Sequence, residues 1–477
     1  MRRARSSYGR RQTASSLIHL TDAGQAAVSS KYFDLQGADT SWNTFGSAFL
    51  AANTAALEDL GVVAHFEVTS RGLELRLAAG GTIGAVPLRS PSTYKVVGGV
   101  VVEPRFGWAG LGRTLEHVEW AAAPQILPLP LVPGTAKEIP PWVLAGPILK
   151  RLAELLHTVT RGFRVAKRVM EQPRGRIDWS AYCREQVLHG QLHRLPCVFP
   201  ELGPDRELLS YVHWGLEEVL HSLRPYAETD PIARRLTAQG VSLIQQVSDF
   251  PAYQPTRSRL DQLLLKSGLP SEALREGLRA LGWVVDKTGL AGRSQPDGLA
   301  WRLPMHELFE NWVAALVRRW CSTRGGRMSR GAAGQISFPL QWEPPGSGSL
   351  RSLVPDVVVD AGETVVIVDA KYKAHYHELE EHRWHEWKEE LKEEHRRDIH
   401  QVMAYCALFE ARRIVAKLVY PLPQQTWQRL AETGRAVSRA VVPGYGRQVE
   451  VRLAGVPLAV ESPITLDDIV DPWGPLH

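Results

Sequence analysis

The sequence predicts a multidomain α/β protein, with a β-rich N-terminal domain, a helical middle domain and a C-terminal αβ core built on a mixed sheet. Three observations support this prediction. The 477 residues are too many for one ordinary hydrophobic core, so we expect two to four domains. The spacing of apolar residues changes along the chain, which marks different kinds of secondary structure. Hydrophobic residues at 44% and charged residues at 22% are typical of a globular protein.

The N-terminal part of the chain predicts strands. From about residue 31 to 125, apolar and polar residues alternate in short runs such as HFEVTS and LELRLAA, separated by turns that contain glycine. We therefore expect a β-rich domain over residues 31–140 that contacts a partner or DNA. Residues 1–30 begin MRRARSSYGRRQ and predict a basic flexible arm. Such an arm could touch nucleic acid, but a bare tail of this kind is more often simply disordered.

Helical spacing follows in the middle of the chain. Apolar residues recur at intervals of three and four in VLAGPILKRLAELLHTVTRGF and ELLSYVHWGLEEVLHSL, so we expect a helical domain over residues 141–295. Residues 296–477 combine a helix, MHELFENWVAALVRRWCST, with strand-like runs, SLVPDVVVD, TVVIVDAKYK and QVEVRLAGVPLAV. This order of elements predicts the C-terminal αβ core.

Charge, cysteines and missing motifs exclude several classes of protein. A net charge of +5 favours a polyanionic partner only weakly in a chain of this size. The four cysteines form no CxxC pair, which argues against a disulfide framework or a cysteine-rich zinc site. We find no signal peptide and no long apolar run, so we expect a cytoplasmic protein without a membrane partner. Phosphate-binding loops of the GxxxxGK[ST] kind are missing, so the chain itself is not expected to be an NTPase.

The two strand-like runs of the C-terminal part predict a hairpin that carries chemistry. Gly362 and Glu363 would form its tip, and counting outward from this turn places Asp356 directly opposite Asp369. We expect the two carboxylates to lie about 5 Å apart. Because side chains alternate along a strand, Lys371 shares a face with Asp369.

This arrangement predicts a metal site. Two opposed carboxylates repel each other unless a cation lies between them, and Mg²⁺ prefers oxygen ligands with room for water and phosphate. We expect Asp356, Asp369 and the backbone carbonyl of Ala370 to bind Mg²⁺, with Mn²⁺ able to substitute. The metal would polarise a phosphoryl oxygen and bind the attacking water. Lys371 would orient that water or stabilise the developing charge.

A structural interpretation of the same residues is that they are turn carboxylates beside a solvated lysine. A PD-x(12)-DAK pattern is a weak motif, and chance matches are common. Valine and isoleucine fill both strands, however, which predicts that the hairpin is buried. Two acids and a lysine at the end of a buried hairpin favour a functional site.

Flanking helices supply further candidates. On MHELFENWVAALV the apolar residues would face the core, which leaves Glu307 and Glu310 as acids near the hairpin, and we choose Glu310 as a metal ligand and catalytic residue. On DIHQVMAYCALFE, Gln401 and Tyr405 lie four residues apart, so they share a face that could reach the site or the DNA backbone. Isolated residues of these kinds are more often ordinary groups on a helix surface.

At this point the sequence resembles McrC, the nuclease subunit of McrBC-type modification-dependent restriction systems, within the PD-(D/E)XK nuclease superfamily. The resemblance covers roughly residues 95 to 420. It rests on GRIDW at 175–179, HRLPCVFPEL at 193–202, LFENWV at 308–313, VPDVVV at 354–359, VDAKYK at 368–373 and DIHQVMAYC at 398–406. Residues 1–90 show no clear likeness, and a charged helix expected at 377–397 lengthens the gap between the last two motifs.

The resemblance implies a restriction-endonuclease-like core and a Mg²⁺-dependent DNA endonuclease of a prokaryotic restriction or anti-phage system. It implies double-stranded DNA as substrate and an AAA+ NTPase or helicase subunit similar to McrB as partner. By motif position, Asp356, Asp369 and Lys371 carry the cleavage roles, supported by Glu310 and Gln401. The DNA modification recognised, the identity of the motor and the oligomeric state stay open.

Two other functions stay open. The chain could be a non-catalytic McrC-like adaptor that binds DNA and recruits or stimulates an NTPase, or a nuclease that acts alone in DNA repair. The histidines between residues 375 and 400 could form a second metal site, although an alternating charged run is more often a solvated helix. Many tryptophans could stack on a flipped base, although core packing is the more usual role.

Overall fold

The structure is a computed structural model. It describes residues 16–29, 42–69, 72–108, 110–122, 124–135, 140–158, 162–203, 205–266, 271–286, 297–343, 350–373, 389–442, 447–461 and 463–475. The chain forms two compact units, of which unit 1 joins residues 1–140 to 295–477 and unit 2 holds residues 141–294. The fold is mixed α/β with several sheets, as the sequence predicts. The division into four parts made from the sequence stays a prediction.

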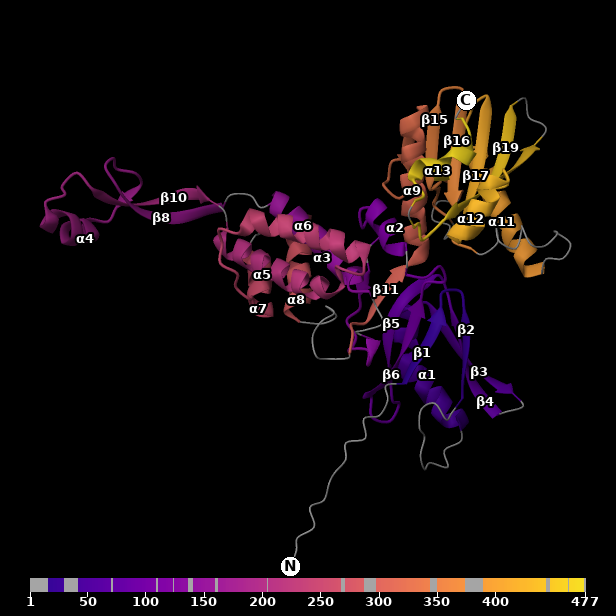
Figure 1. Ribbon diagram of the computed structural model, residues 1–477, viewed down its shortest axis with the longest axis horizontal. Coiled ribbons are helices and arrows are strands. Elements are labelled where there is room, and N and C mark those ends of the chain that lie inside the picture. Colours follow the sequence, from indigo (N-terminus) through magenta and orange to yellow (C-terminus); the bar gives the residue numbers. More distant parts are fainter. Residues whose placement is uncertain are drawn as a thin grey trace, which may run out of the picture. The chain divides into compact units, whose positions relative to one another are not determined.

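The N-terminal part of unit 1 contains a five-stranded sheet (Figure 1). Its strands, in spatial order, are β1 (Ser16–Thr21), β6 (Val96–Glu103), β5 (Thr82–Arg89), β11 (Trp301–Pro304) and β7 (Gln125–Ile126). Strand β1 pairs with β6 in parallel, and the other pairings are antiparallel. Strand β11 comes from the C-terminal part of the sequence, so this sheet is completed by residues far along the chain.

A smaller sheet and a helix accompany this sheet. The order of the smaller sheet is β2 (Gln25–Ser29), β4 (Gly72–Ala79) and β3 (Val62–Thr69), all antiparallel. Helix α1 (Trp42–Asp59) packs on β3 and β5. The alternation analysis predicts only strands in this region. The segment that forms α1 is rich in alanine, which favours a helix more strongly than any other residue.

The C-terminal part of unit 1 is built on a six-stranded mixed sheet, drawn in orange and yellow in Figure 1. Its spatial order is β12 (Arg327–Arg330), β15 (Val357–Ala361), β16 (Thr364–Ala370), β17 (Arg413–Leu422), β19 (Gln448–Pro457) and β18 (Val437–Val442). Strands β16, β17 and β19 are parallel to one another, and the remaining pairings are antiparallel. Every residue of β16 is buried. Two-residue strands β13 (Phe338–Pro339) and β14 (Ser352–Leu353) pair separately.

Helices of the same part pack against this sheet. They are α9 (Met305–Arg324), α11 (Glu389–Cys406) and α12 (Gln424–Glu432), while α13 (Leu466–Val470) and a short α2 (Leu111–His117) of the N-terminal part contact α9. Helix α9 follows β11 without a break, so one continuous segment passes from the N-terminal sheet into the C-terminal core. Residues 374–388 lie outside the described residues, which takes in the first part of the charged helix expected at 377–397 together with His375, His377, His382 and His385.

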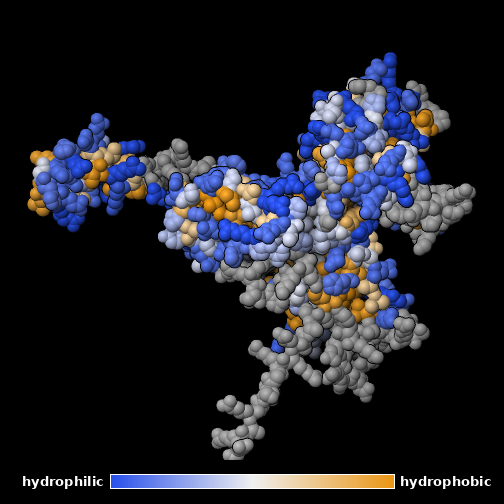
Figure 2. Space-filling view, in the orientation of Figure 1, coloured by the Kyte–Doolittle hydropathy of each residue, from blue (hydrophilic) through white to orange (hydrophobic). Residues whose placement is uncertain are grey.

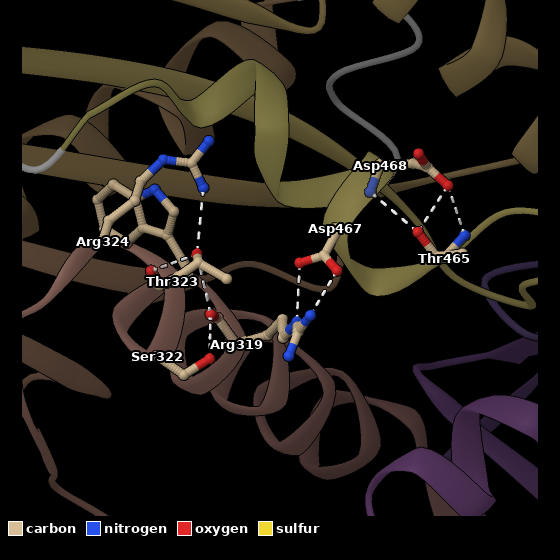
Figure 3. A network of polar contacts seen from close by, with 8 residues as sticks. Arg319, Ser322, Thr323, Arg324, Thr465, Asp467 and Asp468 are labelled. Carbon is tan, nitrogen blue, oxygen red and sulfur yellow. Dashed lines mark hydrogen bonds and ion pairs between the residues drawn. The ribbon is translucent and has the colours of Figure 1, made fainter.

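Helix α9 is fixed to the C-terminal end of the chain by polar contacts. Figure 3 shows the guanidinium of Arg319 on α9 paired with both carboxylate oxygens of Asp467 on α13. Thr465 caps α13 through reciprocal hydrogen bonds with Asp468. The indole of Trp320 donates to the carbonyl of Gly474 over 2.9 Å. These contacts hold α9 at a fixed position along the sheet.

Unit 2 is helical with an inserted β-hairpin arm. Its helices are α3 (Trp142–Thr158), α5 (Arg206–Leu223), α6 (Pro231–Val247), α7 (Arg257–Lys266) and α8 (Glu272–Val285). Asp205, Asp230 and Ser271 cap the starts of α5, α6 and α8, as residues of these types do at helix N-termini. Antiparallel strands β8 (Gly162–Met170) and β10 (Leu195–Gly203) form the arm, with β9 (Arg176–Ile177) on its edge.

The arm has its own small core and an apolar surface. Ala166, Cys197 and Phe199 pack together inside it. Trp179, Leu188 and Leu192 near its tip are 61%, 78% and 62% exposed. Figure 2 shows hydrophobic surface, in orange, at the end of the arm. Among the described residues of the whole chain, none of the helices is long and apolar enough to cross a membrane.

Candidate active site

The β15–β16 hairpin has the register that the sequence predicts. Ala361 pairs with Thr364 and Val357 pairs with Val368, so Gly362 and Glu363 form the tip. Gly362 has a φ of 77°, a left-handed conformation that glycine adopts without strain. Asp356 and Asp369 follow one position beyond the last pair of this ladder.

The two aspartates lie against the same short stretch of backbone. Oδ2 of Asp356 accepts a hydrogen bond from the backbone N–H of Ala370 over 2.8 Å. Asp369, the residue before Ala370, is 1% exposed. Burial raises the pKa of Asp369, and the negative charge of the nearby Asp356 raises it further. The structure therefore brings together the two acids that the hairpin predicts.

Lys371 links this acid pair to helix α11. Its Nζ lies 2.7 Å from Oδ2 of Asp369 and donates a hydrogen bond to Oε1 of Gln401 over 2.8 Å. The amide nitrogen of Gln401 in turn donates to the hydroxyl of Tyr405 over 2.8 Å, and that hydroxyl contacts the carbonyl of Val354 at 3.3 Å. Gln401 and Tyr405 thus share a face of α11, and this face reaches the hairpin.

Glu310 on α9 is a third acid of the cluster formed by Asp356, Asp369 and Lys371. It is half-buried, whereas Glu307 is exposed. Burial raises the pKa of Glu310, and the negative charges of Asp369 and Glu307 add to this effect. Glu310 in turn raises the pKa of Asp356. Of the two acids on α9, Glu310 is the one that the structure embeds in this cluster.

The electrostatic balance of the cluster is unusual for a protein interior. Burial raises the pKa of both Asp356 and Asp369, each to about 6. Burial alone would lower the pKa of Lys371, but the adjacent Asp369 and nearby acids raise it instead. Lys371 is therefore a charged ammonium at neutral pH. Among the described residues, Lys371 and Arg330 act on the three carboxylates of Asp356, Asp369 and Glu310, so the acids outnumber the cations.

Comparison with known protein families finds a match over part of the chain. Residues 286–421 match the family described as "McrBC 5-methylcytosine restriction system component". This segment of the chain is therefore similar to that family. The resemblance found in the sequence is thereby confirmed. The matched segment includes β11, α9, the hairpin and α11, which carry the whole candidate site. No curated protein matches this chain.

Two solved structures are similar to the chain at low identity. One is described as a half-complex from a tetradecameric assembly of Thermococcus gammatolerans McrB AAA+ hexamers with bound McrC. It is 13% identical, the match covers 96% of this chain and 99% of that chain, and the TM-score is 0.42. The second, a Thermococcus gammatolerans McrBC complex, is also 13% identical, with 64% of this chain and 87% of that chain covered and a TM-score of 0.27.

The donors of this site suit a hard divalent cation. Oδ2 of Asp369 is buried and makes no hydrogen bond to any described residue, because its contact with Lys371 lacks hydrogen-bond geometry. Carboxylates of Asp356 and Glu310 and the carbonyl of Ala370 are oxygen donors of the kind that Mg²⁺ prefers. Within the described residues, however, His, Cys, Asp and Glu form no group of three or more arranged as a metal site. The metal roles of these residues stay predictions.

The sequence analysis missed a second acid–base pair beside the first. Lys373 donates to Oδ1 of Asp398 over 2.8 Å, and Asp398 is 4% exposed. The hydroxyl of Tyr420 on β17 contacts the other oxygen of Asp398 at 3.4 Å. A signal was present, because Lys373 is two residues after Lys371, and Asp398 is one helical turn before Gln401.

Proposed function

We propose that the chain is a Mg²⁺-dependent DNA endonuclease subunit with a PD-(D/E)XK core, which hydrolyses phosphodiester bonds of double-stranded DNA. The observation that carries the proposal is the position of Lys371, which touches Asp369 of the hairpin and Gln401 of α11 at once. A lysine held between a buried acid and an amide presents its ammonium at a fixed point. Asp356 and Glu310 belong to the same cluster, and burial raises the pKa of both although Lys371 and Arg330 act in the opposite direction.

A purely structural role explains this cluster less well. A buried carboxylate stabilises a fold when cations and hydrogen bonds satisfy it, and it costs stability when they do not. The raised pKa values of Asp356 and Asp369 mark the second condition. Carboxylates with raised pKa values concentrate at functional sites, where a bound ligand can supply the positive charge that the fold does not provide.

The proposed chemistry assigns a task to each side chain. When bound, Mg²⁺, or Mn²⁺ in its place, would polarise a phosphoryl oxygen and lower the pKa of a water molecule. Asp356, Asp369, Glu310 and the carbonyl of Ala370 would hold it. Lys371 would place positive charge beside the phosphorane-like transition state, where it stabilises the developing charge. Gln401 would hold Lys371 in position through the 2.8 Å hydrogen bond.

We further propose that cleavage depends on an AAA+ NTPase partner within a prokaryotic restriction system that acts on modified DNA. The family description, a component of a 5-methylcytosine restriction system, supports this assignment. The sequence lacks a phosphate-binding loop of its own, so the energy for DNA movement would come from a second subunit. The McrB hexamers of Thermococcus gammatolerans are an example of the partner class.

Cleavage of a plasmid containing 5-methylcytosine tests the proposal. The chain is mixed with its AAA+ partner, NTP and Mg²⁺, and the linear product is measured for the parent protein and Asp369→Asn. We expect cutting by the parent and none by the variant. Asp360→Asn is the matched control, because Asp360 lies on the same hairpin but binds Gly362 and Arg327 at its turn end. Equal cutting by parent and Asp369→Asn would refute the catalytic assignment and favour the adaptor.

A further inference from the structure

Tyr372 connects the candidate active site to the N-terminal sheet. It lies between Lys371 and Lys373, directly after β16. Its hydroxyl donates a hydrogen bond to Oδ2 of Asp22. Asp22 is 2% exposed and follows β1. This contact joins residues 350 positions apart in the sequence.

Arg105 holds both partners of this contact. Its backbone N–H donates to Oδ1 of Asp22 over 2.5 Å, and its Nε lies 3.5 Å from Oδ2. Its guanidinium carbon lies 4.5 Å from the centre of the Tyr372 ring and 4.9 Å from that of Phe106. A cation over an aromatic face is attracted to the ring, so Arg105 binds the carboxylate and the tyrosine together.

The ring of Tyr372 is also enclosed. Phe106 meets it edge-on with the ring centres 6.4 Å apart, and Phe309 of α9, the neighbour of Glu310, lies 6.1 Å away. A Cβ atom at Gly81 would come within 3.3 Å of the ring, so the N-terminal backbone approaches it closely. The N–H of Met305, the first residue of α9, donates to the carbonyl of Gly81 over 2.9 Å. The turn at Gly81 therefore contacts both Met305 of α9 and Tyr372, which follows β16.

We infer that Asp22, Tyr372 and Arg105 form a positioning latch through which the N-terminal domain holds Lys371 in its active orientation. The inference rests on the proposed nuclease function. Strand β16 ends at Ala370, and the N–H of Lys371 donates to the carbonyl of Val419 over 2.8 Å. The carbonyl of Lys371 accepts from the N–H of Lys373 over 2.8 Å, which closes a three-residue turn around Tyr372. Anchoring the side chain of Tyr372 therefore fixes the turn that begins at Lys371.

The latch differs from the catalytic group in what it touches. Asp22 and Arg105 contact Tyr372, and Tyr372 acts through its covalent neighbour, so these are positioning residues. A displacement of about 1 Å at a catalytic group can lower a rate by about 100-fold. Loss of the latch is therefore expected to reduce the rate of the chemical step and to leave DNA binding unchanged.

Tyr372→Phe removes only the hydroxyl and keeps the ring against Arg105. We expect the single-turnover cleavage rate at saturating DNA, partner and Mg²⁺ to fall about tenfold to 100-fold, with the DNA concentration at half-maximal rate unchanged. Tyr211→Phe is the matched control, because the hydroxyl of Tyr211 also donates to a carboxylate, Glu207, in unit 2. The control is expected to cut at the parental rate. Asp22→Asn combined with Tyr372→Phe is expected to be no slower than the slower single variant, because the two residues act as one unit.

Amide hydrogen exchange gives a readout that does not need cleavage. In the chain alone, Tyr372→Phe is expected to speed exchange at the amides of Lys371 and Lys373 and to leave the interior of β16 as protected as in the parent. If the parent never cuts DNA, the nuclease proposal fails while this exchange result still decides whether the latch exists. Unchanged exchange in Tyr372→Phe, or a parental cleavage rate in a parent that cuts, would overturn the latch.

Discussion

Glu450 on β19 and Asp369 on β16 are both buried acids of the six-stranded sheet, but their surroundings differ. Glu450 accepts hydrogen bonds from Arg452 over 2.7 and 3.1 Å and from Arg413 over 3.1 Å. These arginines lower the pKa of Glu450 to about 2. Asp369 contacts Lys371 at 2.7 Å, but burial and the nearby charges of Asp356 and Asp398 raise its pKa.

The comparison separates two uses of a buried carboxylate in one sheet. At Glu450 the positive groups outnumber the acid, so the charge is satisfied by the fold itself. At Asp369 the acids outnumber the lysine, so the fold leaves negative charge for something else to neutralise. The difference indicates that the first cluster stabilises the sheet and that the second is kept for a ligand. Four predictions test this distinction between the two clusters.

The largest effect is expected from Lys371→Ala. Removing the ammonium takes away charge beside the reacting phosphate, so the single-turnover cleavage rate should fall by about 100-fold to 1,000-fold. The measurement is linear product formed by the variant with partner, NTP and Mg²⁺. Lys392→Ala is the control, since Lys392 pairs with Glu389 on the same helix as Gln401 and should cut normally. A parental rate in Lys371→Ala would remove the distinction between the clusters.

Glu450→Gln should reduce the free energy of unfolding by about 3 kcal/mol at pH 7, because it leaves Arg452 buried without its partner charge. Urea titration measures this loss. The lowered pKa of Glu450 stabilises the fold above the ordinary pKa of a glutamate and stops doing so as the pH falls towards about 2. The gap between parent and variant should therefore close over that range. Glu393→Gln, at an exposed pair with Arg396, should cost little.

Mg²⁺ should stabilise the parent chain, because a ligand that binds only the folded state raises the free energy of unfolding. The gain would be about 2.7 kcal/mol at a concentration 100 times the dissociation constant. Thermal unfolding with and without Mg²⁺ measures it. The same titration on Asp369→Asn should show little gain, whereas Glu450→Gln should respond like the parent. An equal gain in all three proteins would place the metal elsewhere.

The smallest effect is expected from Asp356→Asn in the metal-free chain, and its sign is opposite to that at Glu450. Burial raises the pKa of Asp356 to about 6, so its ionisation costs stability above pH 6, and this cost disappears as the pH falls to about 4. The variant should be more stable than the parent by about 1–2 kcal/mol at pH 8 and equal to it near pH 4. An asparagine can still accept the hydrogen bond of Ala370. A less stable variant at pH 8 would show that Asp356 is a structural acid.

Local patterns in the sequence were enough to predict the hairpin. The position of Gly362 fixes the turn, the turn fixes the register, and the register places Asp356 beyond the same ladder as Asp369. Helical periodicity left both Glu307 and Glu310 as candidates, and it is the structure that half-buries Glu310 and exposes Glu307. These inferences depend on residues within one element or on neighbouring strands, where geometry follows directly from spacing.

Contacts between distant parts of the sequence could not be predicted. Nothing in the local pattern pairs Asp22 with Tyr372, and nothing places the short run at β11 between β5 and β7. The strands of the arm were missed because Val165 and Val169 on β8 are 71% and 47% exposed, which reverses the usual burial of such residues. The roles of Asp356, Asp369, Lys371, Glu310 and Gln401 stay predictions until cleavage is measured.

The late position of β11 in the sequence also affects the order in which the fold can form during synthesis. On a ribosome, β5 and β7 emerge early, but the strand that joins them is synthesised only after all of unit 2. Until residue 304 appears, the edge of β5 has no neighbour on that side, and α9 is not yet available to seat beside it. The strand that completes the N-terminal sheet and the helix that carries Glu310 are therefore synthesised directly one after the other, so a chain that stops before residue 301 lacks both.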